Sequence, residues 1–326
     1  MIEARDLTKR FGDTVAVDHL SFVVQPGRVT GFLGPNGAGK STTMRLILGL
    51  DRPTGGQTAI FGKPYSHLTN PLLTVGALLE AKSVHTGRSA RNHLLFLAQT
   101  QGVPASRVDA VLELVGLRAV AGKRAGGYSL GMGQRLGVAA AMLGNPQVLL
   151  LDEPVNGLDP EGVLWIRNLM KQLAAEGRTI LVSSHLMNEM AVTADHLIVI
   201  GRGKLLADAP TEEVIARSSG QSVRVRTPDA DRLIAVITAE RGRAVPATSG
   251  NGSASATPIP TGSQAEVLTV TGIPAARIGE LAASSSIVLH ELTPQLASLE
   301  DAFLELTAGS LEFGHLDAKP ADWSSQ

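Results

Sequence analysis

The residues from Gly34 to Ser41, GPNGAGKS, have the types and spacing of a phosphate-binding loop. Glycines permit positive φ angles, so several backbone N–H groups can point at the oxygens of one anion. Lys40 would reach the β- and γ-phosphates, and the Ser41 hydroxyl would ligate Mg²⁺. The helix expected to follow would direct its N-terminus at the same anion. This stretch therefore predicts a nucleoside triphosphate site.

Two carboxylates follow a second apolar run, VLLLDEP. A strand there would deliver Asp152 to a point where its carboxylate can hold Mg²⁺. Glu153 could then orient and polarise an attacking water as a general base. His185 ends a further apolar strand in LVSSH. A histidine after a strand is more often structural than catalytic, but the other parts of a nucleotide site favour a catalytic role here.

The elements that must position these residues are typical of an α/β fold over residues 1–217, where short β-branched runs alternate with helical patterns. Strands are expected over VTGFLG, QVLLLDEP and TILVSSH, with a hairpin in HLIVIGRGKLLADA that turns at Gly201–Gly203. Helices are expected over STTMRLILGL and over PEGVLWIRNLMKQLAAEG, which closes on a glycine. Arg88–Val115, broken at QGVPASR, predicts a helical insertion within a helical subdomain of about 82–145.

Residues 218–312 are predicted to form a small accessory α+β domain after the linker SSGQS. The expected order is strand SVRVRT, helix DADRLIAVITAERG, strand AEVLTVTG, helix AARIGELAASSS, strand IVLHELTP and helix SLEDAFLELT. The stretch 244–264 carries no charge and is rich in Gly, Ser, Pro and Thr, so a flexible insertion is expected there. The tail 313–326 is expected to be disordered.

The composition argues against several other classes. A formal net charge of −1 supplies no bulk attraction to nucleic acid or to an acidic membrane. The absence of cysteine excludes disulfides, thiolate metal sites and a cysteine nucleophile, and it fits a cytosolic protein. MIEARDLTKRF has no apolar block of a signal peptide, and the apolar run GVAAAMLGNPQVLLL is broken well short of the roughly 20 residues that span a bilayer.

Five motifs in order resemble the ATP-binding subunit of an ABC transporter over residues 1 to about 217. They are the phosphate loop, YSLGMGQRL, LLLDEP, NGLDP and SSH. The resemblance implies that Phe11 stacks on adenine and that His185 is the switch histidine on the γ-phosphate. It implies that Ser129 and Gly131 contact the γ-phosphate held by the other subunit, and that Asp159 lies in the loop crossing the dimer interface. The positions that match the phosphate loop are Gly34, Asn36, Gly37, Gly39, Lys40, Ser41 and Thr42.

The implied mechanism is the head-to-tail closure of two subunits over two Mg·ATP, with Glu153 as general base and hydrolysis reopening the pair. Both half-sites are intact in this sequence, so a homodimer suffices. The implied partner is a separate membrane permease, which would place the chain on the cytoplasmic face of the membrane. No nucleic acid partner is expected.

Two departures from the family pattern are informative. The usual signature is Leu-Ser-Gly-Gly-Gln, whereas this chain has YSLGM, which keeps Ser129 and Gly131. Glu80 stands where the family usually has a glutamine that ligates Mg²⁺, and a carboxylate can also ligate it. The alternative is a solvated Glu80 with the ligand elsewhere. With the ending HELTPQLASLEDAFLELT, these departures resemble the bacitracin- and lantibiotic-type branch, whose ATPase pairs with an ABC-2 export permease.

The alternative function is that of an ABC-type ATPase acting on nucleic acid or the ribosome. Such proteins usually carry two ATPase domains or a long coiled coil, whereas this chain shows one set of motifs, no sustained heptads and no basic run. A nucleotide kinase would leave YSLGMGQRL and NGLDP unexplained. The sequence does not indicate the cargo, because substrate recognition would lie in the permease.

Overall fold

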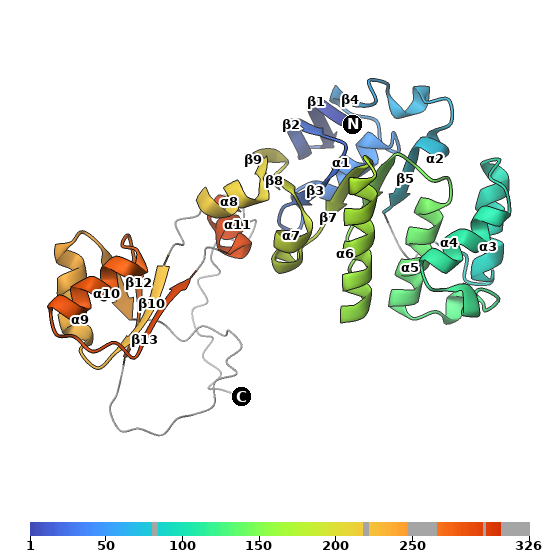
Figure 1. The fold of residues 1–326 in the computed structure, drawn as a ribbon. Helices are drawn as coiled ribbons and strands as arrows, with labels where there is room; N and C mark the ends of the chain where they lie inside the picture. Colours follow the sequence, from blue (N-terminus) through green and yellow to red (C-terminus); the bar gives the residue numbers. More distant parts are fainter. Residues whose placement is uncertain (80–83, 218–221, 247–265, 296–297, 308–326) are drawn as a thin grey trace, which may run out of the picture. The chain divides into compact units, whose positions relative to one another are not determined.

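The computed structural model describes residues 1–79, 84–217, 222–246, 266–295 and 298–307 (Figure 1). These residues form two compact units, residues 1–214 with 303–307 and residues 215–302. None of the helices in the described segments combines the length and the apolar character that a bilayer span needs. Each unit is built on its own sheets and core.

Among the described residues of the first unit, the strands form two sheets. The strands are β1 (Ile2–Phe11), β2 (Thr14–Val24), β3 (Arg28–Leu33), β4 (Gly55–Ile60), β5 (Val75–Leu78), β6 (Val148–Leu151), β7 (Thr179–Ser183), β8 (His196–Gly201) and β9 (Lys204–Pro210). A six-stranded sheet has the order β5-β6-β7-β3-β8-β9 and is parallel except for the antiparallel pair β8–β9. A three-stranded antiparallel sheet has the order β2-β1-β4.

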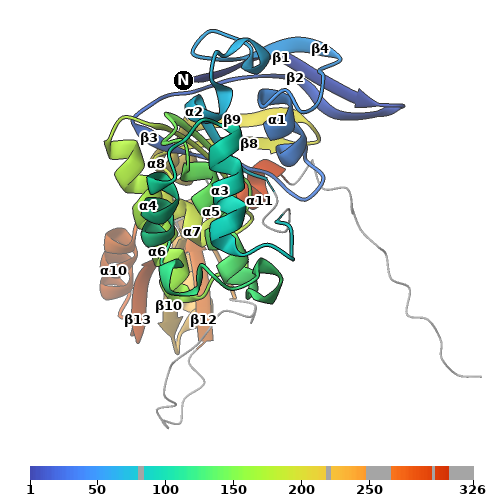
Figure 2. The same cartoon turned by 90° about the vertical axis from the view of Figure 1, so that its right-hand side faces the viewer.

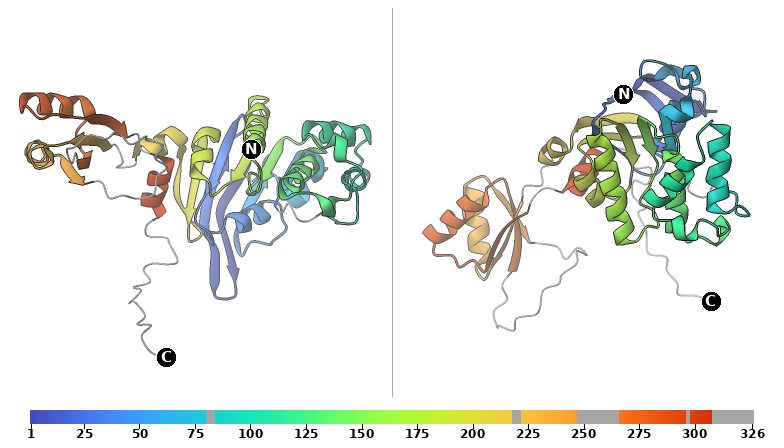
Figure 3. Two further views of the ribbon diagram at one scale, coloured as in Figure 1. Left: turned by 90° about the horizontal axis from the view of Figure 1, so that it is seen from below. Right: turned by 45° about the vertical axis from the view of Figure 1, so that its right-hand side comes forward.

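Helices surround these sheets. They are α1 (Lys40–Ile47), α2 (Pro71–Thr74), α3 (Ala90–Thr100), α4 (Ser106–Leu114), α5 (Leu130–Met142), α6 (Pro160–Ala175), α7 (Met187–Thr193) and α8 (Thr211–Arg217), with short 3₁₀ turns η1 (Tyr65–His67), η2 (Arg118–Val120) and η3 (Ala125–Gly127). Helices α3, α4 and α5 pack together as a helical layer (Figure 2). Helix α6 lies along β3 and β7 of the six-stranded sheet (Figure 3).

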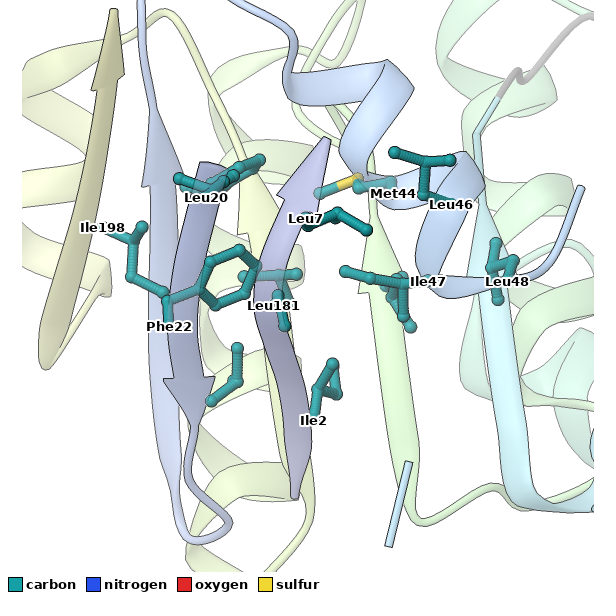
Figure 4. Packing of buried hydrophobic residues seen from close by; sticks show 14 of the residues in the cluster. Ile2, Leu7, Leu20, Phe22, Met44, Leu46, Ile47, Leu48, Leu181 and Ile198 are labelled. Atoms are coloured by element: carbon teal, nitrogen blue, oxygen red, sulfur yellow. The ribbon is translucent and has the colours of Figure 1, made fainter. Parts of the chain in front are cut away.

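The main core lies between the three-stranded sheet with α1 and one face of the six-stranded sheet (Figure 4). Ile2 and Leu20 of the small sheet and Ile47 of α1 meet Leu181 of the large sheet. Because successive residues of a strand point to opposite faces, the neighbouring Ile180 faces the other side, and it too is fully buried. Strands buried on both faces are what a parallel sheet requires.

The predicted α/β fold is confirmed in the first unit. The predicted strands are β3, β6 and β7, and the hairpin is β8–β9, with Gly203 at φ 78°. The predicted helices are α1 and α6, the latter followed by Gly177 at φ 87°. Helices α3 and α4 lie on either side of the predicted break.

The second unit has the element order β-α-β-β-α-β. Its elements are β10 (Ser222–Thr227), α9 (Ala230–Ala239), β11 (Arg243–Pro246), β12 (Glu266–Thr271), α10 (Ala275–Ser284) and β13 (Glu291–Gln295), and α11 (Leu299–Thr307) follows. The antiparallel sheet has the order β11-β12-β10-β13, which is the split βαβ arrangement of ferredoxin-like domains. Its core joins the sheet to α9 and α10.

Three details of the second unit differ from the expectation. Residues Arg243–Pro246 pair with β12 as strand β11, although a flexible insertion was expected from Ala244. Strand β13 starts at Glu291 and not at Ile287, because the Ile287 N–H bonds to the Ala282 carbonyl and closes the end of α10. The last part of α11, from Phe303, groups with the first unit. The expectations for 247–264 and for 313–326 lie outside the described residues.

Candidate functional site

The phosphate loop joins the carboxyl end of β3 to α1, and its glycines are required by its shape. At Gly34 a Cβ would lie 2.6 Å from the carbonyl oxygen of Ile200. Gly37 and Gly39 have φ angles of 79° and 101°, a region that L-residues rarely adopt. Gly39 precedes α1 directly and no side chain caps that helix. The N-terminus of α1 thus has no side-chain cap, and an uncapped helix N-terminus of this kind can bind an anion.

A pocket of about 340 Å³ surrounds this loop. It is lined by residues 36–42 together with Ala16, Leu79, Asp152 and Glu153. The two carboxylates come from the carboxyl end of β6, which lies two strands away from β3 in the sheet. The parallel order thus brings the glycine loop and the acidic pair to one edge of the sheet, where ligands of such folds bind.

Lys40 is the cation of this pocket and is buried, with 8% of the residue exposed. Its ammonium donates to the carbonyl oxygens of Gly34 at 2.6 Å and Pro35 at 3.1 Å. Burial lowers the pKa of Lys40, while the charges of Glu153 and Asp152 raise it. The ammonium is thus held within the loop, where phosphate oxygens can compete for it.

A hydroxyl–carboxylate pair borders the pocket and fits a metal site. The Ser41 hydroxyl donates to Asp152 Oδ2 at 2.6 Å. The other oxygen of that carboxylate, Oδ1, accepts from the Ser183 hydroxyl. Hydroxyl and carboxylate oxygens are the hard ligands that Mg²⁺ prefers. Within the described residues, no cluster of three or more His, Cys, Asp or Glu side chains could hold a metal by protein ligands alone.

Glu153 is held in an unusual backbone conformation with φ 50°. Its N–H donates to Ser183 Oγ at 3.0 Å, and its carboxylate Oε2 lies 2.6 Å from His185 Nδ1. The structure therefore joins the two predicted catalytic residues directly. Glu153 lines the pocket, whereas His185 is half-exposed at the end of the loop that follows β7.

Phe11, the predicted adenine contact, ends β1 and is 51% exposed. It is not among the residues that line the pocket, but Ala16 of the adjacent strand is. The Lys9 ammonium lies 4.7 Å from the centre of the Phe11 ring. One face of the ring is therefore covered by a cation.

The predicted signature residues lie apart from the pocket, around the start of α5. Ser129 caps α5 by accepting from the Met132 N–H at 3.2 Å. Asp159 caps α6 by accepting from the Gly162 N–H at 2.8 Å. A Cβ on Gly131 would lie 2.9 Å from the carbonyl oxygen of Gly157. These three residues thus share one surface region of the subunit, next to its own Glu153 loop.

Two buried polar residues of the site were not assigned a role from the sequence. Ser183 contacts both Asp152 and Glu153, and Gln134 donates to the carbonyl oxygen of Glu153 at 2.9 Å. Both lie inside motifs that the sequence displays, SSH and YSLGMGQRL. A hydroxyl at the end of a buried strand was the only signal for Ser183. Glu80, the predicted third metal ligand, lies outside the described residues.

A second hollow of about 430 Å³ lies beside β5, α3 and α5. Most of its lining is apolar, including Leu48, Leu72 and Leu97. His93 of α3 also lines it, and burial together with the charges of Arg88 and His85 lowers the pKa of this imidazole. The hollow is therefore a largely apolar surface with the charged side chain of Arg45 in its lining, and the lowered pKa favours a neutral His93 there at about pH 7.

A strand, glycine loop and helix, with an acidic pair at the end of a parallel strand two positions away in the sheet, define a P-loop NTPase. The family model described as ABC transporter matches residues 17–156. Two further models match: an AAA domain, putative AbiEii toxin, Type IV TA system, over residues 123–191, and a domain of unknown function over residues 221–300.

Within the P-loop NTPases, the similar proteins are ATP-binding subunits of transporters. Bacitracin transport ATP-binding protein BcrA of Bacillus licheniformis is 43% identical over 67% of this chain and 72% of its own length. Lantibiotic transport ATP-binding protein SrtF of Streptococcus pyogenes is 33% identical over 64% of this chain and 90% of its own length. The dimeric structure of MJ0796, a bacterial ABC transporter cassette, matches with 25% identity and a TM-score of 0.59 over 65% of this chain and 99% of that chain.

The chain belongs to the family of ABC transporter ATP-binding proteins. It is an ATPase that binds ATP, and the predicted likeness to the bacitracin and lantibiotic branch is confirmed.

Proposed function

We propose that this chain energises export through a separate ABC-2-type permease, and that two copies of it close head to tail over ATP. Relatives named for bacitracin and lantibiotic transport support the export role. The similar cassette MJ0796 is dimeric, which supports pairing. In this role the chain sits at the cytoplasmic face of the membrane and is held there by the permease.

The contact between Glu153 and His185 at the edge of the phosphate pocket is the observation that carries this proposal. Glu153 accepts the proton of the attacking water, and its carboxylate is already oriented by the imidazole. His185 is half-exposed, so it can turn from Glu153 to a γ-phosphate. Phe11 supplies the adenine contact, with Lys9 bracing the other face of its ring.

Ser41 and Asp152, with Glu80 as the third candidate, would hold Mg²⁺, which neutralises charge on the phosphates. Lys40 and the N–H groups from Gly37 to Thr42 bind and orient the triphosphate. Lys40, Ser41, Asp152 and the loop from Gly37 to Thr42 line one pocket, so a single Mg·ATP can contact all of these groups.

Ser129, Gly131 and Asp159 do not line the pocket of their own subunit. Their shared position at the start of α5 and in the loop before α6 leaves them available to a second subunit. The Ser129 hydroxyl and the N-terminus of α5 would supply donors to the partner's γ-phosphate. The largely apolar hollow beside α3 and α5 is the surface that would bind the permease.

The test is Glu153→Gln, which keeps the size of the side chain and removes the base. We expect ATP binding to persist, turnover to fall by about 100-fold or more, and a dimer to accumulate in ATP. Size-exclusion chromatography with light scattering measures the dimer, and phosphate release measures turnover. Glu113→Gln, at an exposed position of α4, is the matched control and should behave as the parent chain does. Parental turnover in Glu153→Gln would remove Glu153 as the base.

The permease is tested by isolating the tagged chain from its native host. A multi-spanning membrane protein recovered in near-equal amount supports the export role. Recovery with ribosomes or DNA, and without a membrane partner, contradicts it.

A further inference from the structure

Gln134 begins the second turn of α5, and 4% of the residue is exposed. It does not line the nucleotide pocket. Its Nε2 donates to the carbonyl oxygen of Glu153 at 2.9 Å, across 19 residues of sequence. Burial of a side-chain amide costs free energy unless the amide is hydrogen-bonded, so this hydrogen bond to Glu153 stabilises the buried position of Gln134.

The backbone that receives this bond is the one at φ 50°. A glutamate persists in this region only when its surroundings hold it there. Three hydrogen bonds hold the backbone of Glu153. Its N–H donates to Ser183 Oγ, and its carbonyl oxygen accepts from the Asn156 N–H at 3.2 Å and from Gln134. Only the Gln134 contact comes from the helix that begins at the signature serine.

The start of α5 is also packed tightly on the loop that follows Glu153. A Cβ on Gly131 would lie 2.9 Å from the Gly157 carbonyl oxygen, and one on Gly157 would lie 2.3 Å from Leu130 Cδ2. Helix and loop therefore cannot slide past each other without displacing backbone. Helix α5 thus contacts the segment around Glu153 at two points, the Gly131–Gly157 approach and the Gln134 hydrogen bond.

We propose that Gln134 is a positioning residue, which fixes the backbone of Glu153 and ties its carboxylate to the orientation of the signature helix α5. This inference rests on the proposed role of Glu153 as general base. Because Ser129 caps the same helix, engagement of Ser129 by a partner's nucleotide is passed to the catalytic carboxylate of its own subunit.

The test uses Gln134→Met in the full chain, which keeps volume and removes the donor. The Glu153 carbonyl still accepts from Asn156, so the variant retains a partner for that group. We expect kcat to fall by about 10- to 100-fold, as for a reacting group displaced by about 1 Å, with the KM for ATP within about twofold. Gln172→Met on the exposed face of α6 is the control and should leave both constants unchanged. If Gln134→Met is unstable, Gln134→Glu repeats the test, because a carboxylate cannot donate to the carbonyl.

A second background separates positioning from general stability. In Glu153→Asp, whose carboxylate is already retracted, Gln134→Met should lower kcat by less than about threefold. An equal loss in both backgrounds, or a raised KM with an unchanged kcat, would overturn the inference. If Glu153→Gln abolishes turnover while Gln134→Met keeps the parental kcat, the inference alone fails. If Glu153→Gln turns over normally, the proposed role of Glu153 fails, and the inference fails with it.

Discussion

Individual glycines of this chain share a positive φ angle but differ in whether the surroundings leave room for a side chain. Gly39 and Gly27 both have positive φ, at 101° and 79°. A Cβ on Gly39 would lie 2.4 Å from the Ala16 carbonyl oxygen, while a Cβ on Gly27 would meet nothing within 4 Å. Position 39 therefore needs glycine for two reasons, its left-handed backbone and the close approach of the Ala16 carbonyl to the phosphate loop.

These two glycines give a matched pair of substitutions. Gly27→Ala should cost about 1–2 kcal/mol of folding free energy through its left-handed backbone and leave ATP affinity unchanged. Gly39→Ala should displace the loop and weaken ATP binding by at least about tenfold. Chemical denaturation and binding of a fluorescent ATP analogue measure the two effects. Equal ATP affinities in both variants would contradict the assignment of Gly39.

The residues of the site that the sequence reveals are those whose geometry is local. The phosphate loop is contiguous with its strand and helix, and Asp152 and Glu153 directly end an apolar run, so pattern alone finds them. Gln134 and Ser183 act through contacts 19 and 30 residues away from Glu153. Those contacts depend on the pairing of β6 with β7 and on the packing of α5 against β5, which no local pattern specifies.

At the scale of elements, helix α5 combines two roles at its first turn. Ser129 is both the N-cap, through the Met132 N–H, and the proposed contact to a partner's phosphate. Capping contributes stability within the monomer, whereas the phosphate contact exists only in the dimer. Substitution can therefore separate the two roles.

Ser129→Asp should keep the cap, because aspartate caps as well as serine, and it should place a negative charge against the γ-phosphate. We expect parental thermal stability and loss of the ATP-trapped dimer when the change is made in Glu153→Gln. Ser89→Ala removes the equivalent cap of α3, where Ser89 accepts from the Asn92 N–H at 3.2 Å. It should lower stability by about 1 kcal/mol and leave the dimer intact. A dimer of normal affinity in Ser129→Asp would exclude the phosphate contact.

Helix α3 gives the apolar hollow a pH dependence through His93. Its pKa is lowered from 6.5, first by burial and then by Arg88 and His85. Below pH 6.5 the unfolded chain therefore takes up a proton that the folded chain resists, so stability falls as pH falls toward the folded pKa. His93→Leu should reduce the difference in Tm between about pH 7.5 and about pH 5.5. His290→Leu, at an exposed position in the other unit, should leave that difference unchanged.

Elements of the second unit show why short strands are hard to predict. Strand β11 has only Arg243–Pro246, and its last three residues share the uncharged composition of the stretch that follows. These four residues form a strand because they pair with the edge of β12 that faces away from β10, with Ala244 opposite Val270. Such pairing is a tertiary effect that outweighs local propensity.

At the scale of the whole molecule, the chain holds two units with separate cores. The proposed ATP site is lined by residues of the first unit, so the binding free energy of ATP should be added to the stability of that unit. All of the described residues that line the nucleotide pocket belong to the first unit. Its order β-α-β-β-α-β is complete within residues 222–295.

Two core substitutions test this separation. Ile237→Ala in α9 and Ile180→Ala in β7 each remove a fully buried side chain, at a cost of about 2–5 kcal/mol to its own unit. Calorimetry should resolve two transitions, of which Ile237→Ala lowers one and Ile180→Ala the other. Added Mg·ATP should raise only the transition that Ile180→Ala lowers. A single transition that shifts with both substitutions would contradict independent units.

Strand β3 occupies the middle of the large sheet, yet both of its hydrogen-bonded neighbours lie far along the chain. Its partner β7 leaves the ribosome about 150 residues after β3, which takes on the order of ten seconds of translation. Until then the apolar β3 has no sheet to join, and the loop that follows it has no fixed frame. Nucleotide can therefore bind only after synthesis has passed β7 and β8, and chaperones have the intervening interval in which to cover an unpaired strand.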